Sequence, residues 1–262
     1  MIFVLLKLIV MKRLYCALAV FCAVSVASAC AQEAPSVPDV PSVPESPDIP
    51  ENVIKTFSVL GDSYSTFEGY IPEGNAWWYS TTPQGPNDVV RVEDTWWSQF
   101  SDVTGYELLL NESWSGSTIC NTGYDDVPCP TWSFIARMKN IVAGDSDPDL
   151  ILICGGTNDS WANSPIGQLK FGDWTDDDLA SYLPACCYML DYLRREAPEA
   201  LIVCVINSEL KPEITQGQFD ACEHYGAHAL LLKDIDKEWG HPSVAGMTAM
   251  CEQVSAFVSE LK

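Results

Sequence analysis

Short runs of hydrophobic residues alternate along the chain, from about residue 53 onward, with longer segments whose hydrophobic positions recur at helical spacing. The short runs are rich in Leu, Ile and Val and are apolar on both faces. This pattern is typical of strands that are covered on both sides in a parallel sheet. Five runs show it: residues 56–61, 106–113, 149–156, 200–207 and 228–235.

The segments between these runs carry the helical pattern. Asp176 to Asp178 place acidic residues in a first helical turn, Gly226 ends another helix, and Pro242 lies near the start of the last one. Strands that alternate with helices predict an α/β fold, with one doubly wound parallel sheet and helices on both of its faces. The predicted helical segments are residues 131–144, 176–198, 216–226 and 241–262.

Polar segments follow the predicted strands, at the edge where such sheets bind their ligands. Four of them hold polar residues of interest: GDSYS at 61–65, NESWSGST at 111–118, GGTNDSW at 155–161 and DKEWGHP at 236–242. A serine hydroxyl needs a neighbouring base to become a nucleophile, and a developing oxyanion needs fixed N–H donors. Ser63 and His241 provide the nucleophile and the base, and Gly61 permits the sharp exit that exposes Ser63. The N–H groups of Ser63 and Gly116 and the amide of Asn158 provide the donors.

These four segments, in this order, resemble the sequence blocks of the SGNH or GDSL hydrolase family from about residue 55 to residue 262. Each block alone is typical of a turn or loop, whereas four blocks in order at strand ends are specific. The resemblance implies a three-layer α/β/α sandwich with a flavodoxin-like sheet, no cofactor, and ester hydrolysis through an acyl-serine intermediate. It also implies that Ser63 is the nucleophile, His241 the base, and Gly116 and Asn158 oxyanion donors.

The acid that would orient His241 departs from the family pattern. The family usually has Asp three residues before the histidine, where this chain has Glu238. Glutamate fills this role in some serine hydrolases, so Glu238 is the favoured candidate. Asp236 at a different spacing, or a dyad supported by a backbone carbonyl, are the alternatives.

Other kinds of site are disfavoured by the sequence. The Gly-x-Ser-x-Gly elbow of α/β-hydrolases does not occur around Ser63, and no glycine-rich phosphate loop is present. Cys222, His224 and His228 have spacing that resembles a zinc site but lack a fourth ligand. No metal or cofactor is therefore predicted.

A long segment, residues 66–100, separates Ser63 from the second predicted strand and contains Trp77 and Trp78. Long ordered loops tend to be functional, and aromatic faces beside a nucleophile can stack on sugar rings. Trp161, just after Asn158, is placed to line the same pocket. These three tryptophans are predicted to bind substrate, and the alternative is that the loop aromatics only pack the loop onto the domain.

The N-terminal region predicts export. Residues 1–29 read as a signal peptide that ends in Ala-Ser-Ala, and Cys30 directly after them resembles the lipidated cysteine of a bacterial lipoprotein, although Ala27 stands where leucine is usual. The proline-rich residues 30–52 predict a stiff spacer before a hydrolase domain at 53–262. A periplasmic or cell-surface protein anchored through Cys30 is expected, and the alternative is a plain exported protein.

The net charge limits the classes of binding partner, and the positions of the cysteines indicate which of them could form a disulfide. A net charge of -22 repels phosphate backbones and anionic headgroups, so nucleic acid is not expected as a partner, nor is the membrane except through the lipid anchor. Cys120 and Cys129 are near enough in sequence to staple one loop, whereas Cys154 and Cys204 lie in apolar runs and are expected to be buried.

Together these features predict an exported serine esterase that removes small acyl groups, such as acetyl, from a carbohydrate or another acylated small molecule. A lipase or lysophospholipase on the same fold is an alternative, distinguished by its preference for long acyl chains. A non-catalytic glycan-binding lipoprotein is another, motivated by the absence of the usual Asp. The joint presence of Ser63, Asn158 and His241 argues against a decayed site.

Overall fold

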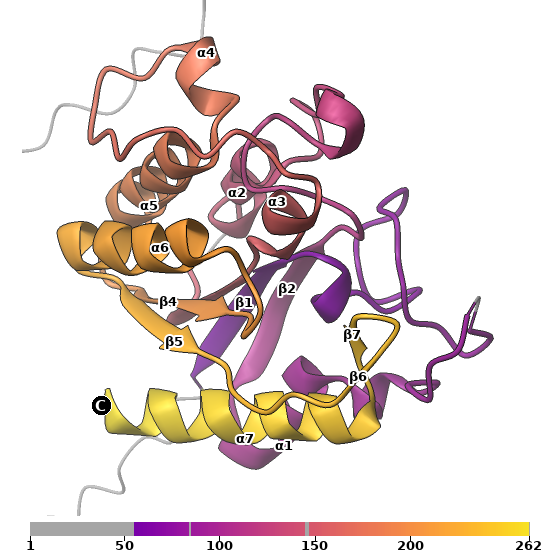
Figure 1. The fold of residues 1–262 in the computed structure, drawn as a ribbon. Coiled ribbons are helices and arrows are strands. Elements are labelled where there is room, and N and C mark those ends of the chain that lie inside the picture. Colours follow the sequence, from indigo (N-terminus) through magenta and orange to yellow (C-terminus); the bar gives the residue numbers. More distant parts are fainter. Residues whose placement is uncertain (1–54, 84, 145–146, 262) are drawn as a thin grey trace, which may run out of the picture. The chain divides into compact units, whose positions relative to one another are not determined.

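The computed structural model describes residues 55–83, 85–144 and 147–261. Its main feature is a five-stranded sheet in which every strand pair is parallel and the spatial order is β2-β1-β3-β4-β5 (Figure 1). This confirms the predicted α/β fold and all five predicted strands. The strands are β1 (Thr56–Gly61), β2 (Glu107–Ser113), β3 (Leu150–Cys154), β4 (Leu201–Ile206) and β5 (His228–Leu231).

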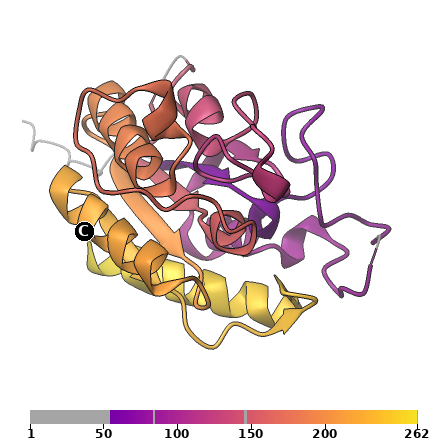
Figure 2. The ribbon, with the colours of Figure 1, turned by 45° about the horizontal axis from the view of Figure 1, so that its top comes forward.

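Helices cover both faces of the sheet and make three layers. Helices α1 and α7 pack on one face and α2, α5 and α6 on the other (Figures 1 and 2). The helices are α1 (Trp96–Thr104), α2 (Phe134–Ile141), α3 (Thr157–Trp161), α4 (Asp176–Leu179), α5 (Tyr182–Glu196), α6 (Pro212–Tyr225) and α7 (Val244–Glu260). Shorter elements are the 3-10 turns η1 (Ser63–Ser65), η2 (Val92–Asp94) and η3 (Tyr124–Asp126) and the hairpin strands β6 (Lys237–Glu238) and β7 (His241–Pro242).

The central strands are buried on both sides, which explains their continuous hydrophobic runs. In β3, Ile151 and Ile153 pack in the core under α2, α5 and α6, while Leu150 and Leu152 pack under α1 and α7. All four side chains are fully buried, and each such burial contributes about 1.5–3 kcal/mol. The strong packing of β3 and its neighbour β1 fixes the sheet edge from which the polar segments emerge.

Several helix boundaries differ from the sequence prediction. The last helix begins at Val244 rather than at residue 241, because His241 and Pro242 form β7 and Ser243 caps the helix, and α2 begins at Phe134 rather than at residue 131. The segment 176–198 forms two helices, α4 and α5, that are separated at Ala180 and Ser181. Pro184 accounts for the break, because its ring would clash with the carbonyl of Ala180 in a continuous helix and it has no N–H to donate. Helix α6 starts at Pro212 rather than at residue 216, since proline is favoured in a first turn.

The cysteines of the described region are all free thiols, and all eight are buried. Burial of Cys154 and Cys204 confirms the prediction for these two residues. Cys120 and Cys129 are not bridged: the Cys129 thiol lies 3.2 Å from the hydroxyl of Thr118, and the Cys120 thiol donates to the Thr122 carbonyl at 3.5 Å. Hydrogen bonds therefore hold this loop in place of a disulfide between Cys120 and Cys129.

The predicted signal peptide and the spacer up to residue 52 lie outside the described residues. Within residues 55–83, 85–144 and 147–261, no helix combines the length and the hydrophobicity that crossing a bilayer requires.

Candidate active site

Ser63 lies where β1 leaves the core. Asp62 caps the turn η1 by accepting a hydrogen bond from the Tyr64 N–H at 3.0 Å, and Ser63 is the first residue of this turn. Gly61 is required here for space, since a Cβ would lie 2.4 Å from Ser113 Oγ and 2.7 Å from Ser65 Cβ. The path by which the chain leaves β1 therefore requires glycine at position 61, because neighbouring serines approach it closely. The expectation that this exit exposes Ser63 is wrong: Ser63 is only 3% exposed, since it packs against His241.

His241 meets Ser63 from the other end of the chain. Its Nε2 lies 3.0 Å from Ser63 Oγ, although 178 positions separate the two residues. Burial lowers the pKa of His241 to about 4, and the hydrogen bond to the Trp239 carbonyl opposes this shift in part. The imidazole is therefore neutral at pH 7 and can accept the serine proton.

In the part of the chain that the structure describes, a backbone carbonyl rather than a carboxylate supports His241. Its Nδ1 lies 3.2 Å from the carbonyl oxygen of Trp239, which fixes the proton on Nδ1 and leaves Nε2 as acceptor. The side chain of Glu238 is exposed and makes no hydrogen bond or ion pair to any described residue. Asp236 instead accepts a hydrogen bond from the Ser243 hydroxyl. The backbone of Glu238 pairs with that of His241 across the hairpin, but among the described residues its carboxylate is not bonded to the imidazole, and the carbonyl-supported dyad is the arrangement present.

The hairpin geometry explains this arrangement. Residues 239 and 240 connect β6 to β7 as a two-residue turn, with φ of 50° at Trp239 and 78° at Gly240. Positive φ at both central positions is the signature of a type I′ turn, which reverses the chain tightly. The reversal brings the Trp239 carbonyl back toward the His241 ring.

A hydrogen-bond network anchors this hairpin to the sheet. The Tyr64 hydroxyl donates to the Gly240 carbonyl at 2.5 Å and accepts a bond from Asn207 Nδ2 at 3.1 Å. Lys237 Nζ, on β6, donates to Asn207 Oδ1 at 2.9 Å. The residue next to the nucleophile and the residue that follows β4 therefore hold the loop that carries the base.

The predicted oxyanion donors lie on two adjoining segments. Gly116 has a φ of 84°, a conformation that favours glycine, and Asn158 Nδ2 donates to the neighbouring Ser117 carbonyl at 3.0 Å. Tyr124 donates its hydroxyl to Asn158 Oδ1 at 2.8 Å, which fixes which way the amide points. Within the described part of the chain, the backbone N–H groups of Ser63 and Gly116 have no hydrogen-bond acceptor. They and the second N–H of the amide are free to bind an oxyanion.

A buried guanidinium ties these donors together. Arg137 donates to the Gly61 carbonyl at 3.2 Å, to the Ser117 hydroxyl at 2.9 Å and to the Glu112 carbonyl. Burial lowers the pKa of Arg137 to about 10, opposed by the Glu112 carboxylate, so the group stays charged at pH 7. Arg137 thus connects the exit of β1, which leads to Ser63, with the turn at Gly116.

Two buried aspartates complete the framework. Asp159 accepts hydrogen bonds from the Ile119 N–H at 2.8 Å and the Cys120 N–H at 3.2 Å, which holds the loop after Gly116 against α3. Burial raises the pKa of Asp159 to about 6. Burial likewise raises the pKa of Asp62 to about 7, opposed by the Tyr64 N–H.

The predicted aromatic residues have different positions. Trp78 lies flat against the His241 ring, with centroids 3.7 Å apart and planes 9° from parallel. Trp161 meets the same ring edge-on at 5.8 Å, packs on the turn at Gly240 and stays 44% exposed. Trp77 is half-buried and makes no ring contact with His241 among the described residues. Trp161 and Trp78 are therefore at the site, and Trp77 is not in contact with the base.

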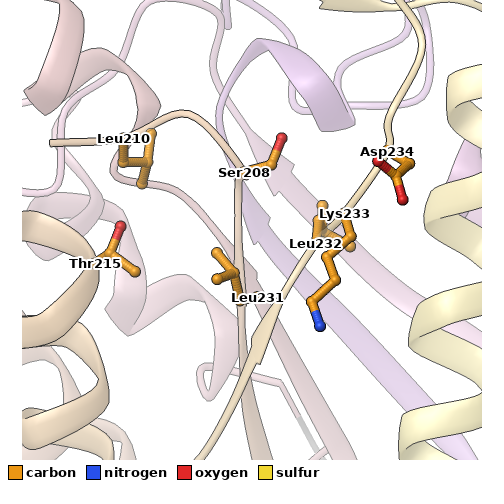
Figure 3. A pocket seen from close by; sticks show the side chains of 7 residues that line it. All are labelled: Ser208, Leu210, Thr215, Leu231, Leu232, Lys233 and Asp234. Atoms are coloured by element: carbon orange, nitrogen blue, oxygen red, sulfur yellow. The ribbon is translucent and has the colours of Figure 1, made fainter. Parts of the chain in front are cut away.

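A hollow of about 370 Å³ opens beside the site, at the carboxyl ends of β4 and β5 (Figure 3). Its Leu210 lies near Gly156, which precedes α3. None of the predicted site residues lines it. Its lining residues are Ser208, Leu210, Thr215, Leu231, Leu232, Lys233 and Asp234.

Sequence reasoning missed two contributors to the site, Arg137 and Tyr124. Arg137 had a visible signal, because it occupies a position on the apolar face of α2, between the buried Phe134 and Met138. A charged residue at such a position requires buried partners. Tyr124 gave no signal, since its role depends on loop conformation. Support of His241 by a backbone carbonyl was an alternative from the sequence, which did not say that Trp239 supplies it.

Comparison with known proteins identifies the family of this chain. The model of the GDSL-like lipase/acylhydrolase family matches residues 55–258. The chain belongs to this family. As a GDSL-like hydrolase it acts on ester bonds, and its three-layer fold is the one expected of the family.

Solved structures of similar proteins agree with this membership. A protein described as a GDSL-like lipase from Bacteroides uniformis is 47% identical, with a TM-score of 0.75 over 79% of this chain and 96% of that chain. A similarly described protein from Bacteroides ovatus is 43% identical, with a TM-score of 0.75 over 79% of this chain and 99% of that chain. A family two carbohydrate esterase from Clostridium thermocellum shares the fold at 16% identity, with a TM-score of 0.54 over 79% and 64% of the two chains. No functionally curated protein matches this GDSL-like hydrolase.

Proposed function

We propose that this GDSL-like hydrolase removes small acyl groups, acetyl above all, from a carbohydrate through an acyl-serine intermediate. The observation that carries the proposal is the 3.0 Å contact between Ser63 Oγ and a neutral His241 Nε2. A nucleophile and a base at hydrogen-bond distance are the minimum for acyl transfer by serine.

The geometry supports a two-step reaction. Ser63 Oγ attacks the ester carbonyl carbon while its proton passes to His241 Nε2, and the N–H groups of Ser63, Gly116 and Asn158 bind the oxyanion. As the bond from carbon to the sugar oxygen breaks, His241 returns the proton to that oxygen, and the acyl group stays on Ser63. Water then attacks with His241 as base again, releasing the carboxylic acid and restoring the serine hydroxyl.

Aromatic side chains around the site support a carbohydrate as the other half of the ester. Trp239 is 77% exposed, Trp161 44% and Tyr124 40%, and all three contact or flank His241 or Asn158. Exposed aromatic faces stack on the apolar faces of sugar rings. Carbohydrate esterases are among the proteins that share this fold.

A lipase or lysophospholipase on the same fold is the alternative. The two activities differ in acyl-chain preference, which the assay below measures.

We further propose that the protein is exported and anchored at the cell surface or in the periplasm through Cys30, on the evidence of the signal-like residues 1–29. Replacement of Cys30 by Ser should move the protein from the membrane fraction to the soluble exported fraction. Retention in the membrane fraction would contradict the lipid anchor.

The first test is hydrolysis of p-nitrophenyl acetate by the parent protein and by Ser63→Ala, with Ser259→Ala on α7 as a matched serine control. We expect loss of at least about 1,000-fold in kcat for Ser63→Ala and parent activity for Ser259→Ala. The parent should then release acetate from acetylated polysaccharide and prefer acetyl to octanoyl esters. Equal and negligible rates in parent and Ser63→Ala would contradict the esterase, and a preference for octanoyl esters would favour the lipase.

The pH dependence of this reaction follows from His241. Because its pKa is lowered to about 4, the base stays unprotonated well below pH 6. We expect kcat/KM to keep its neutral-pH value down to about pH 5 and to fall near pH 4. An acid limb centred near pH 6.5, measured on the same substrate, would show that His241 is not held in its buried environment.

A further inference from the structure

The stacking of Trp78 on His241 differs from every other aromatic contact at the site. The two rings lie 3.7 Å apart and 9° from parallel, whereas the rings of Tyr64, Tyr79 and Trp161 cross the imidazole at 57° or more. Among the described rings near His241, only Trp78 presents its whole π face to the imidazole. This is the geometry in which an aromatic ring attracts a cation.

Hydrogen bonds through Thr66 link the position of Trp78 to that of the nucleophile Ser63. The backbone N–H of Trp78 donates to Thr66 Oγ1 at 2.9 Å. The Thr66 hydroxyl in turn donates to the backbone carbonyl of Ser63 at 3.0 Å. The neighbouring Tyr79 donates its hydroxyl to the Pro242 carbonyl at 2.8 Å, one residue after His241. The segment from Thr66 to Tyr79 therefore contacts both Ser63 and the residue after His241, and it helps to hold the nucleophile and the base in position.

His241 becomes positively charged in each half-reaction, and no carboxylate of residues 55–83, 85–144 or 147–261 is hydrogen-bonded or ion-paired to it. Ionisable side chains lie on all the elements packed around the ring, but none is hydrogen-bonded or ion-paired to Nδ1. Burial makes an uncompensated imidazolium costly. The ionisable groups on these elements are Asp62 and Tyr64 near η1, Tyr79 after Trp78, Asp159 on α3, and Asp236, Lys237 and Glu238 on or next to the hairpin.

We propose that Trp78 is a positioning residue of the reaction: its stack holds the His241 ring in the plane where Nε2 meets Ser63 Oγ, and its π face stabilises the transient imidazolium in the absence of a triad carboxylate. The inference rests on the proposed esterase function. The buried Trp78 Nε1 has no hydrogen-bond partner among the described residues, so polar contacts of the indole do not explain its placement.

The test compares Trp78→Leu, which keeps an apolar wall without a π system, with Trp78→Phe, which keeps an aromatic face. We expect kcat to fall about tenfold in Trp78→Leu with KM within about twofold of the parent, and to stay within about threefold in Trp78→Phe. The molecule offers a matched control in its second stack of this kind, Phe171 on His224, with centroids 3.8 Å apart. Phe171→Leu should leave kcat unchanged.

A second readout does not depend on activity. The chain has three histidines, so NMR titration can follow each imidazole separately. In Trp78→Leu the pKa of His241 should fall further, because burial is kept and the attraction of the π face is lost. The resonances of His224 and His228 serve as internal references in the same spectra.

Several outcomes would overturn the inference. Trp78→Leu with kcat within twofold of the parent would show that the stack is not used. A rise of the His241 pKa toward 6.5 would show that Trp78 acts only by excluding water. If Trp78→Leu melts much below the parent, Trp78→Met is read by the same criteria. A parent without esterase activity would refute the proposed function, while the titration would still decide whether Trp78 stabilises the imidazolium.

Discussion

Replacement of Gly61 should displace the nucleophile Ser63 directly. A methyl group at this position would overlap Ser113 Oγ and Ser65 Cβ, and neither can withdraw easily because both residues are fully buried. We expect Gly61→Ala to lower the free energy of unfolding by about 1–3 kcal/mol and to lower kcat by displacing Ser63. Urea unfolding and esterase assays on the same preparation would measure both.

Gly172→Ala is the matched control for this prediction. A Cβ at Gly172 would have no heavy atom within 4 Å, and its φ lies outside the left-handed region. Its stability and kcat should equal those of the parent. Equal behaviour of the two alanine variants would show that space at Gly61 does not position Ser63.

Tyr124 should act through Asn158. Its hydroxyl fixes the amide by donating to Oδ1, so Tyr124→Phe frees the amide to rotate and should lower kcat about threefold to tenfold. In a double-mutant cycle, Tyr124→Phe should have little further effect in an Asn158→Ala background. Tyr70→Phe, an exposed tyrosine, serves as control. Additive effects of the two changes would contradict this coupling.

At the scale of elements, the hairpin β6–β7 carries both the base and its support. Because the support is the Trp239 carbonyl, Glu238→Gln should leave kcat and the acid limb of kcat/KM within about twofold of the parent. Asn207→Ala, which removes a partner of both Tyr64 and Lys237, should lower kcat instead. A large loss in Glu238→Gln would show that the carboxylate reaches His241 during turnover.

The elements that the sequence predicted best are the strands. The central strands β1, β3 and β4 are buried almost throughout, whereas the edge strands β2 and β5 are partly exposed although their sequences are also apolar runs. The order of polar segments after the strands was enough to place Ser63, Asn158 and His241 at one edge of the sheet. The support of His241 could not be predicted from Glu238, because the type I′ turn that aims the Trp239 carbonyl depends on two backbone dihedrals. The stacking of Trp78 on His241 could not be predicted either, because an aromatic residue in a loop belongs to no periodic hydrophobic pattern.

At the scale of the whole molecule, buried ionisable groups make stability depend on pH in two opposing ways. Asp62 and Asp159 have raised pKa values, so they stabilise the folded state at acid pH and this contribution is lost as the pH rises from about 4 through 6 and 7. His241 has a lowered pKa, so its contribution is lost as the pH falls from about 6.5 to 4.

Asp62→Asn tests the first of these contributions. The amide keeps an acceptor for the Tyr64 N–H and cannot ionise, so the free energy of unfolding should decline less between pH 5 and pH 8 than in the parent. Asp177→Asn, at an exposed position on α4, should leave the parent profile unchanged. A parallel decline in parent and Asp62→Asn would show that Asp62 does not titrate in this range.

The base of the site comes after all five strands along the chain. A ribosome has therefore finished the sheet, the nucleophile and every oxyanion donor before it reaches His241, and helix α7, which covers one face of the sheet, follows later still. A growing chain that stops short of residue 241 holds Ser63 without a partner to take its proton. On the proposed mechanism, the chain therefore becomes able to hydrolyse esters only late in synthesis, and an incomplete chain is inactive even where its sheet has formed.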